Sequence, residues 1–116
     1  MQDRVLGMSK ALALAGNEHT IGDVVGEILR GEAQSWERDG AWIVTRVVDM
    51  PRVRSLHFWL ASGEKAACVK LAREIIEWGR GIGCTRATLF GREGWTRVLQ
   101  NEGWRPSELV VLEREI

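Results

Sequence analysis

The fold is decided by residues 55–90, which read SLHFWLASGEKAACVKLAREIIEWGRGIGCTRATLF. The first part alternates between apolar and polar residues, which is typical of a strand over 55–61. Apolar residues at helical spacing then predict a long helix over 64–81 with a wide apolar face. Glycines follow, and the β-branched and apolar residues of 85–90 predict another strand. A strand, a long helix and a strand in this order predict a parallel crossover.

Two helices and a hairpin are predicted before this stretch. Apolar residues recur at helical spacing over 3–15, and Thr20 is a good N-cap for a second helix that ends at Gly31. The strands predicted over 34–38 and 41–50 flank the dipeptide Asp39-Gly40. This dipeptide supplies the positive φ angles that a tight hairpin turn requires.

A helix over 94–102 and a last strand over 109–112 complete the predicted order, which is α-α-β-β-β-α-β-α-β. The chain is predicted to be a single domain over residues 1–116, with the helix within 1–16 at its periphery. The fold class is α/β with a mixed sheet of the α+β kind, because antiparallel hairpin strands adjoin the parallel crossover.

The composition limits the classes of partner, location and metal site that the chain can have. Sixteen basic and sixteen acidic residues cancel, so no charge excess favours nucleic acid or an anionic membrane. No apolar run reaches the ~20 residues that span a bilayer, and no signal peptide is visible. The two cysteines, Cys68 and Cys84, lie among apolar neighbours without metal-ligand spacing. They favour a reducing, cytoplasmic location and predict no metal site.

Two stretches resemble the GNAT family of N-acetyltransferases. Residues 63–89 are similar to the central loop, long helix and following strand of that family, and GWTRVLQNEGWR at 94–105 is similar to its late helix. The resemblance covers about residues 20–116 and implies acetyl-coenzyme A binding at a splayed strand and at the loop that follows. The short, Trp-rich chain also resembles small GNAT-like proteins encoded by bacteriophages.

The resemblance assigns cofactor binding to six positions, Leu60, Ser62, Gly63, Lys65, Ala66 and Ala67. The family loop is rich in glycine, which lets backbone N–H groups at a helix start hold pyrophosphate. Here Glu64 and Ala66 occupy the two glycine positions when the loops are aligned without a gap. A carboxylate beside pyrophosphate costs about 1 kcal/mol in water and several where water is excluded. We therefore expect no cofactor, or acetyl-coenzyme A if the protein is catalytic; an ordinary helix start capped by Ser62 is the alternative for the loop.

Acetyl transfer needs a base for the attacking amine and an acid for the leaving thiolate. The resemblance places the acid of the family, commonly a Tyr, at Leu99, and the chain contains no Tyr. His57 is a candidate base because histidine titrates near neutral pH, and Asp49 at a strand end is a second candidate. A hydrogen-bonded strand histidine and a solvated strand-end acid are the alternative interpretations.

Three of the six tryptophans, Trp36, Trp42 and Trp59, fall on consecutive predicted strands. Alternation in the strand 55–61 predicts two sets of side chains on opposite faces: Leu56, Phe58 and Leu60 against His57 and Trp59. Either the first or second helix covers the Trp side, or a partner chain does. In the second case the three Trp are interface anchors, because Trp is enriched at interface hot spots.

Three functions stay open at this point. The missing Tyr, altered loop, neutral charge and many Trp favour a GNAT-like pseudoenzyme that acts by protein contact or self-association. A structural or assembly component of a phage particle is an example, located in the host cytoplasm or the virion. The second function is an active acetyl-coenzyme A-dependent N-acetyltransferase on an unknown amine. The third is an α/β module for an unrelated small ligand.

Overall fold

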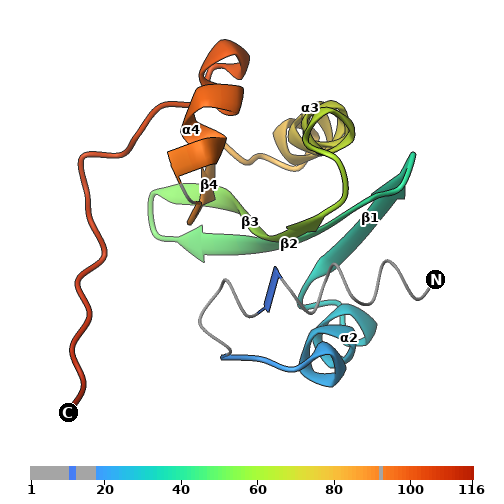
Figure 1. Ribbon diagram of the computed structural model, residues 1–116. Coiled ribbons are helices and arrows are strands. Elements are labelled where there is room, and N and C mark those ends of the chain that lie inside the picture. Colours follow the sequence, from blue (N-terminus) through green and yellow to red (C-terminus); the bar gives the residue numbers. More distant parts are fainter. Residues whose placement is uncertain (1–10, 13–17, 92) are drawn as a thin grey trace.

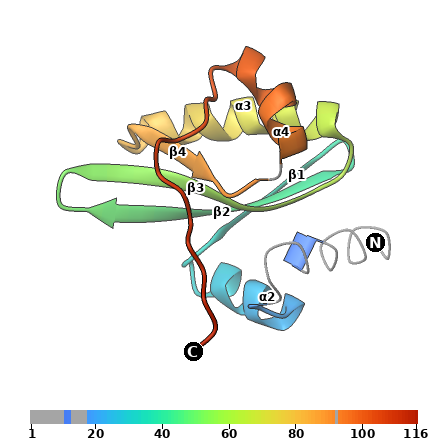
Figure 2. The ribbon, with the colours of Figure 1, turned by 60° about the vertical axis from the view of Figure 1, so that its left-hand side comes forward.

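The computed structural model describes residues 11–12, 18–91 and 93–116. Its four strands lie in sequence order across one sheet, β1 (Gln34–Arg38), β2 (Ala41–Met50), β3 (Val53–Ser62) and β4 (Arg86–Leu89). The helices are α2 (Ile21–Leu29), α3 (Lys65–Gly81) and α4 (Glu93–Leu99), which a 3-10 turn, η1 (Gln100–Glu102), extends. Helices α3 and α4 lie on one face of the sheet, and α2 lies on the other (Figures 1 and 2).

Short local signals set several of these boundaries. The Thr20 side chain accepts a hydrogen bond from the Asp23 N–H at 3.1 Å, and the Asp23 carboxylate accepts one from the Thr20 N–H at 2.8 Å. This reciprocal pair caps the first turn of α2. Asp39 and Gly40 both have positive φ, 51° and 82°, which matches the twist of the β1–β2 hairpin. The predicted cap and hairpin turn are therefore confirmed.

The sheet is mixed, as the sequence predicts. Strands β1, β2 and β3 pair antiparallel. Strand β4 pairs parallel to β3, from Ser55 opposite Arg86 to Phe58 opposite Leu89. The parallel crossover through α3 and the mixed α+β fold class are confirmed.

A β-bulge in β3 changes which side chains face α3. Leu60 pairs with Val44, but the next pair joins Phe58 to Thr45, so Trp59 is the extra residue. An extra residue reverses the alternation of side chains beyond it. Phe58 therefore packs in the cluster beneath α3, whereas Leu60 packs in the cluster against α2. The prediction that Leu60 shares a face with Leu56 and Phe58 is wrong for this reason.

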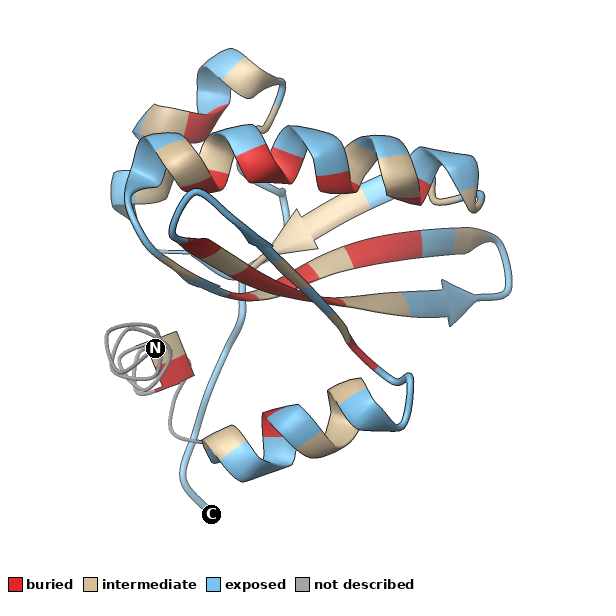
Figure 3. Cartoon of the chain, turned by 90° about the vertical axis from the view of Figure 1, so that its right-hand side faces the viewer, coloured by how far each residue is buried: buried red, intermediate tan, exposed pale blue. Residues whose placement is uncertain are grey.

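Two apolar clusters hold the layers together (Figure 3). One joins the sheet to α3 and includes Leu56, Phe58 and Ile75. The other joins the opposite face to α2 through Val24 and Val44, with Trp42 and Trp59 packed against it. Helix α2 thus contributes to the cover over these two Trp side chains, which was one of the two predicted arrangements.

The C-terminal segment differs from the prediction. Residues 109–112 form no strand, and the four side chains Leu109, Val110, Val111 and Leu112 are 75–89% exposed. An apolar, β-branched run indicates strand propensity but contains no information about the neighbouring strand that it needs. The predicted helix over 3–15 lies outside the described residues except for 11–12, which are helical. None of the described helices is long and apolar enough to cross a membrane.

Candidate functional site

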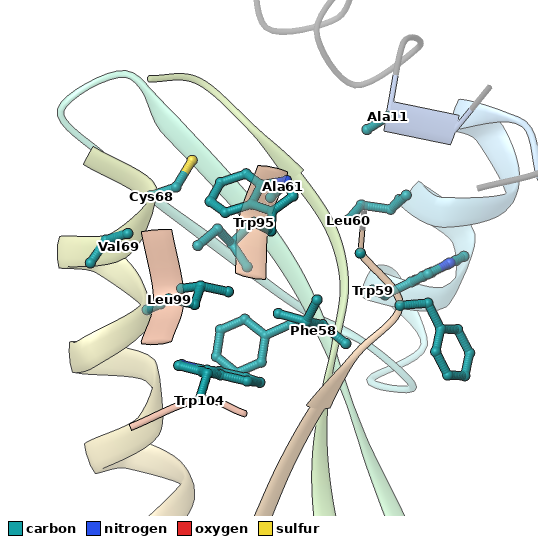
Figure 4. Close-up of a pocket in the computed structure, with 15 residues that line it drawn as sticks. Ala11, Phe58, Trp59, Leu60, Ala61, Cys68, Val69, Trp95, Leu99 and Trp104 are labelled. Carbon is teal, nitrogen blue, oxygen red and sulfur yellow. The ribbon is translucent and has the colours of Figure 1, made fainter. Parts of the chain in front are cut away.

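Strands β3 and β4 separate at one end of the sheet. Their pairing stops at Phe58 and Leu89, whereas β3 continues to Ser62. A pocket of about 370 Å³ lies at this gap. Its walls come from β3, β4, α3 and α4, with a contribution from residue 11 (Figure 4).

The pocket reaches both faces of the sheet. Cys68, Val69 and Leu99 line it from the side of α3 and α4, whereas Trp59 and Leu60 line it from the side of α2 (Figure 4). The bulge at Trp59 turns Leu60 to that second side. The pocket therefore passes through the gap between the two strands.

The wall formed by α4 and the segment after it depends on a sharp turn. Gly103 adopts the left-handed conformation, with φ 86°, and ends the 3-10 turn. The chain then reverses, so that the Trp104 N–H donates to the Leu99 carbonyl at 3.3 Å. The Trp104 ring meets Phe58 edge to face, with centroids 5.5 Å apart. These contacts place three apolar side chains from separate parts of the chain around one cavity.

The start of α3 lies beside the pocket, and no side chain of the described residues caps it. Glu64 is the N-cap residue, yet its side chain makes no hydrogen bond to the first turn. The first helical hydrogen bond joins the Cys68 N–H to the Glu64 carbonyl at 2.9 Å. The N–H groups of residues 65–67 consequently have no acceptor within the helix. The prediction of a start capped by Ser62 is wrong.

Gly63 has a structural reason to be glycine. Its φ is 117°, and an added Cβ would lie 2.8 Å from the Gly40 carbonyl oxygen and 2.9 Å from the Ala41 Cα. The loop before α3 therefore packs directly on the β1–β2 hairpin. This close approach positions the uncapped helix start.

The lining of the pocket is almost free of titratable groups. Among the described lining residues, Cys68 alone titrates, and burial raises the pKa of its thiol. Its Sγ lies 3.6 Å from the Ser62 carbonyl oxygen. Leu99, where the resemblance places the acid of the family, lines the pocket and is buried. Two cations lie over aromatic rings of the pocket wall: the Arg46 guanidinium is 3.5 Å from the centroid of the Trp59 ring, and the Lys65 ammonium is 5.7 Å from that of the Trp95 ring.

Neither predicted base enters the pocket lining. His57 is half-buried, and its Nδ1 shares a hydrogen bond of 2.8 Å with the Thr88 hydroxyl. Burial lowers the pKa of His57, and the positive charge of Arg46 lowers it further. Asp49 lies at the far end of β2, where it accepts a hydrogen bond from Arg54 at 2.6 Å. In the described part of the chain, no group of three His, Cys, Asp or Glu side chains is arranged to hold a metal ion.

The three predicted interface tryptophans all lie partly within the fold. The Trp36 indole donates to Thr45 at 3.0 Å, and the Trp42 indole donates to Ser35 at 2.7 Å. The Arg46 guanidinium stacks on Trp59, 3.5 Å from the ring centroid. Of the three, Trp59 alone lines the pocket.

The predicted cofactor residues form two groups. Leu60 lines the pocket, whereas Ser62, Gly63, Lys65, Ala66 and Ala67 lie at the α3 start beside it. Sequence reasoning missed the main walls, Phe58, Leu89, Trp95 and Trp104. Each has the pattern of a core residue, and only the bulge and the end of the β3–β4 pairing make them a pocket.

Comparison with known proteins gives a result at the level of the fold. No family model matches the chain, and no curated protein matches it in sequence. A glucosamine-6-phosphate N-acetyltransferase from Arabidopsis thaliana is 12% identical, with a TM-score of 0.66 over 97% of this chain and 92% of that one. A predicted acetyltransferase from Clostridium acetobutylicum, solved with acetyl-coenzyme A, is 10% identical, with a TM-score of 0.67 over 94% and 87%. A Trypanosoma brucei acetyltransferase is 13% identical, with a TM-score of 0.64 over 94% and 93%. This chain therefore has the fold of the GNAT acetyltransferases.

Proposed function

We propose that this protein binds an acyl-coenzyme A thioester, with the acyl end in the pocket between β3 and β4 and the pyrophosphate against the start of α3. One observation carries the proposal. The pocket at the strand gap lies directly beside a helix whose first N–H groups have no acceptor within the helix and no cap from a described side chain.

The charge and shape of the helix start fit an anion. The N–H groups of residues 65–67 and the positive end of the α3 dipole both favour negative charge. No acidic residue lies in the first turn of α3, and Lys65 does. The Glu64 side chain is exposed, so its repulsion is screened by water and costs about 1 kcal/mol. This geometry favours a ligand over the cofactor-free interpretation of the sequence.

The pocket suits the apolar part of such a ligand. The walls are aromatic and aliphatic, so they exclude water from a bound acyl group. A bound thioester would supply an activated acyl carbonyl. The bulge at Trp59 also interrupts the β2–β3 ladder at the pocket, and bulges are over-represented next to active sites, where they re-aim a side chain or end the pairing.

We infer that the described residues lining this pocket cannot act as the acid or the base of acetyl transfer. Burial raises the pKa of the Cys68 thiol, so near pH 7 this group is neither a thiolate base nor a ready proton donor, and Leu99 has no proton to donate. The His57 ring packs on the lining residue Phe90, but its Nδ1 is engaged with the Thr88 hydroxyl. Asp49 lies at the far end of β2, where it pairs with Arg54. We therefore expect the protein to bind the thioester but to release its acyl group slowly, as a pseudoenzyme would.

Isothermal titration calorimetry with acetyl-coenzyme A tests the binding. The substitution Val69→Trp fills the pocket from α3, and Lys70→Trp puts the same side chain on an exposed position of that helix. We expect binding by the native chain and by the Lys70 variant, and at least a tenfold loss for the Val69 variant. No binding at millimolar ligand, or equal loss in both variants, contradicts the proposal.

Release of free thiol from acetyl-coenzyme A tests the slow transfer. We expect almost no release by the native chain with a panel of amines. A well-placed general acid contributes a factor of roughly 10²–10⁴, so Leu99→Tyr should increase release and the equally bulky Leu99→Phe should not. Rapid turnover by the native chain would establish an active transferase instead.

The exposed apolar C-terminal segment, residues 109–112, favours a second function through protein contact. Together with the resemblance to phage-encoded proteins, it supports a role as an assembly component of a phage particle. Mass spectrometry of purified particles of the encoding phage tests this role. The protein should be present in fixed stoichiometry, and its absence from the particles excludes a place in the virion.

A further inference from the structure

Strand β4 ends the described sheet and has a neighbour, β3, on one side only. The N–H of Thr85 donates to the Arg54 carbonyl at 3.0 Å, toward β3. Because N–H groups alternate in direction along a strand, those of Ala87 and Leu89 also point to β3. The N–H and carbonyl groups of Arg86 and Thr88 then point outward. The outer side of β4 is a template for another strand.

The C-terminal segment has the properties of the missing strand. It contains four consecutive large apolar residues, 109–112, each at least 75% exposed. Four is also the length of β4. In an extended conformation, alternate residues face opposite ways, so both faces of this segment would be apolar. Such a strand is stable only where each face is covered.

The path of the chain takes this segment away from its own sheet edge. Trp104 packs on Phe58, next to the last residue of β4. From there the chain runs past the end of the sheet and finishes on the side of α2, opposite α3 and α4 (Figures 1 and 2). Within the described part of the chain, the apolar segment and the outer edge of β4 therefore both lack a strand partner.

We propose that two copies of this chain form a dimer in which residues 109–112 of each copy pair with the β4 edge of the other. The segment and the edge belong to one chain and match in length. The outward N–H and carbonyl groups of β4 can form hydrogen bonds with those of the exposed segment. The formal net charge is zero, which leaves little repulsion between copies. A twofold pair satisfies both edges and both segments at once, and exchange of an identical element is a low-cost route to a dimer.

Sedimentation velocity of the full chain gives the first test, with a dimer of twice 13.1 kDa expected. Arg86→Pro removes one outward N–H from the edge, and proline is tolerated at the first residue of an edge strand. Arg86→Ala keeps that N–H and is the matched control. We expect at least a tenfold weaker dimer for the proline variant and no change for the alanine variant.

A second pair of variants tests the segment. Val111→Asp places a charge in it, and Leu29→Asp places the same charge at another exposed apolar residue, on α2. Dimer formation should weaken at least tenfold for the first and stay unchanged for the second. Circular dichroism spectra that match the native spectrum show that each variant still folds.

Mixing the two defective chains separates exchange from pairing within one chain. The Val111→Asp variant keeps an intact β4 edge, and the Arg86→Pro variant keeps an intact segment 109–112. In a mixture, the segment of the second can therefore pair with the edge of the first, which restores one of the two strand pairings of the dimer. Hybrid dimers of the mixture, detected by two fluorescent labels, support exchange. A native chain that is monomeric at 0.1 mM and above, or a mixture that forms no hybrid, overturns the proposal.

Discussion

The substitution Gly63→Ala measures how the loop before α3 is held against the hairpin. Alanine at a φ of 117° incurs the backbone cost of a positive φ, about 1–2 kcal/mol. Its Cβ would also lie below 3.0 Å from two backbone atoms, the Gly40 oxygen and the Ala41 Cα. Backbone atoms move less readily than side-chain ends, and overpacking of this kind costs about 1–3 kcal/mol. We expect a total loss of about 2–5 kcal/mol.

Gly31→Ala is the matched control. Gly31 also has positive φ, 77°, but nothing lies within 4 Å of its added Cβ. This variant should lose only the backbone part, about 1–2 kcal/mol. Urea unfolding followed by Trp fluorescence gives both values. In thermal unfolding, each kcal/mol corresponds to roughly 4 °C for a domain of this size. Equal losses for the two variants would refute the claim that contact with the hairpin requires glycine at position 63.

Three further predictions follow from groups near the sheet. Arg46→Ala leaves the Glu27 carboxylate, 15% exposed, without its 2.7 Å partner, and should cost about 2 kcal/mol in urea unfolding; Arg46→Lys should recover less than half, because lysine cannot pair through two N–H groups. Burial holds the pKa of His57 below its ordinary 6.5, so the unfolded chain takes up a proton first as pH falls. Stability should therefore be full well above pH 6.5 and decline as pH falls below 6.5. His57→Gln should flatten this decline, and an unchanged slope contradicts the cause. Cys68 should react slowly with iodoacetamide because burial raises its pKa, and acetyl-coenzyme A should slow it further; equal rates with and without ligand would place the ligand elsewhere.

Much of the fold follows from local signals in the sequence. The capping pair at Thr20 and Asp23, the Asp39-Gly40 turn and the helical spacing over 64–81 all act within a few residues. The parallel crossover follows from element order alone. The residues at 109–112 mark the limit of this reasoning, because strand formation there depends on a neighbour that the local pattern does not identify.

The candidate site was harder to predict than the fold. The resemblance points to the region of the pocket, since the α3 start and Leu60 lie there. The bulge at Trp59 has no local signal, and it alone reverses the direction of Leu60. His57 has the chemistry of a base, but alternation in β3 directs it away from Phe58 toward Thr88. The sequence shows which side chains have acid or base chemistry. The face of the sheet to which each side chain points depends on the register of the strands.

We expect the open start of α3 and the adjoining pocket to hold a coenzyme A thioester. Titration of ¹⁵N-labelled protein with acetyl-coenzyme A, followed by backbone amide shifts, tests it most directly. We expect the largest shifts at the amides of residues 65–67, followed by those of the bulge at 59–61. Amide shifts that are absent at millimolar ligand, or confined to residues away from these two segments, would contradict it.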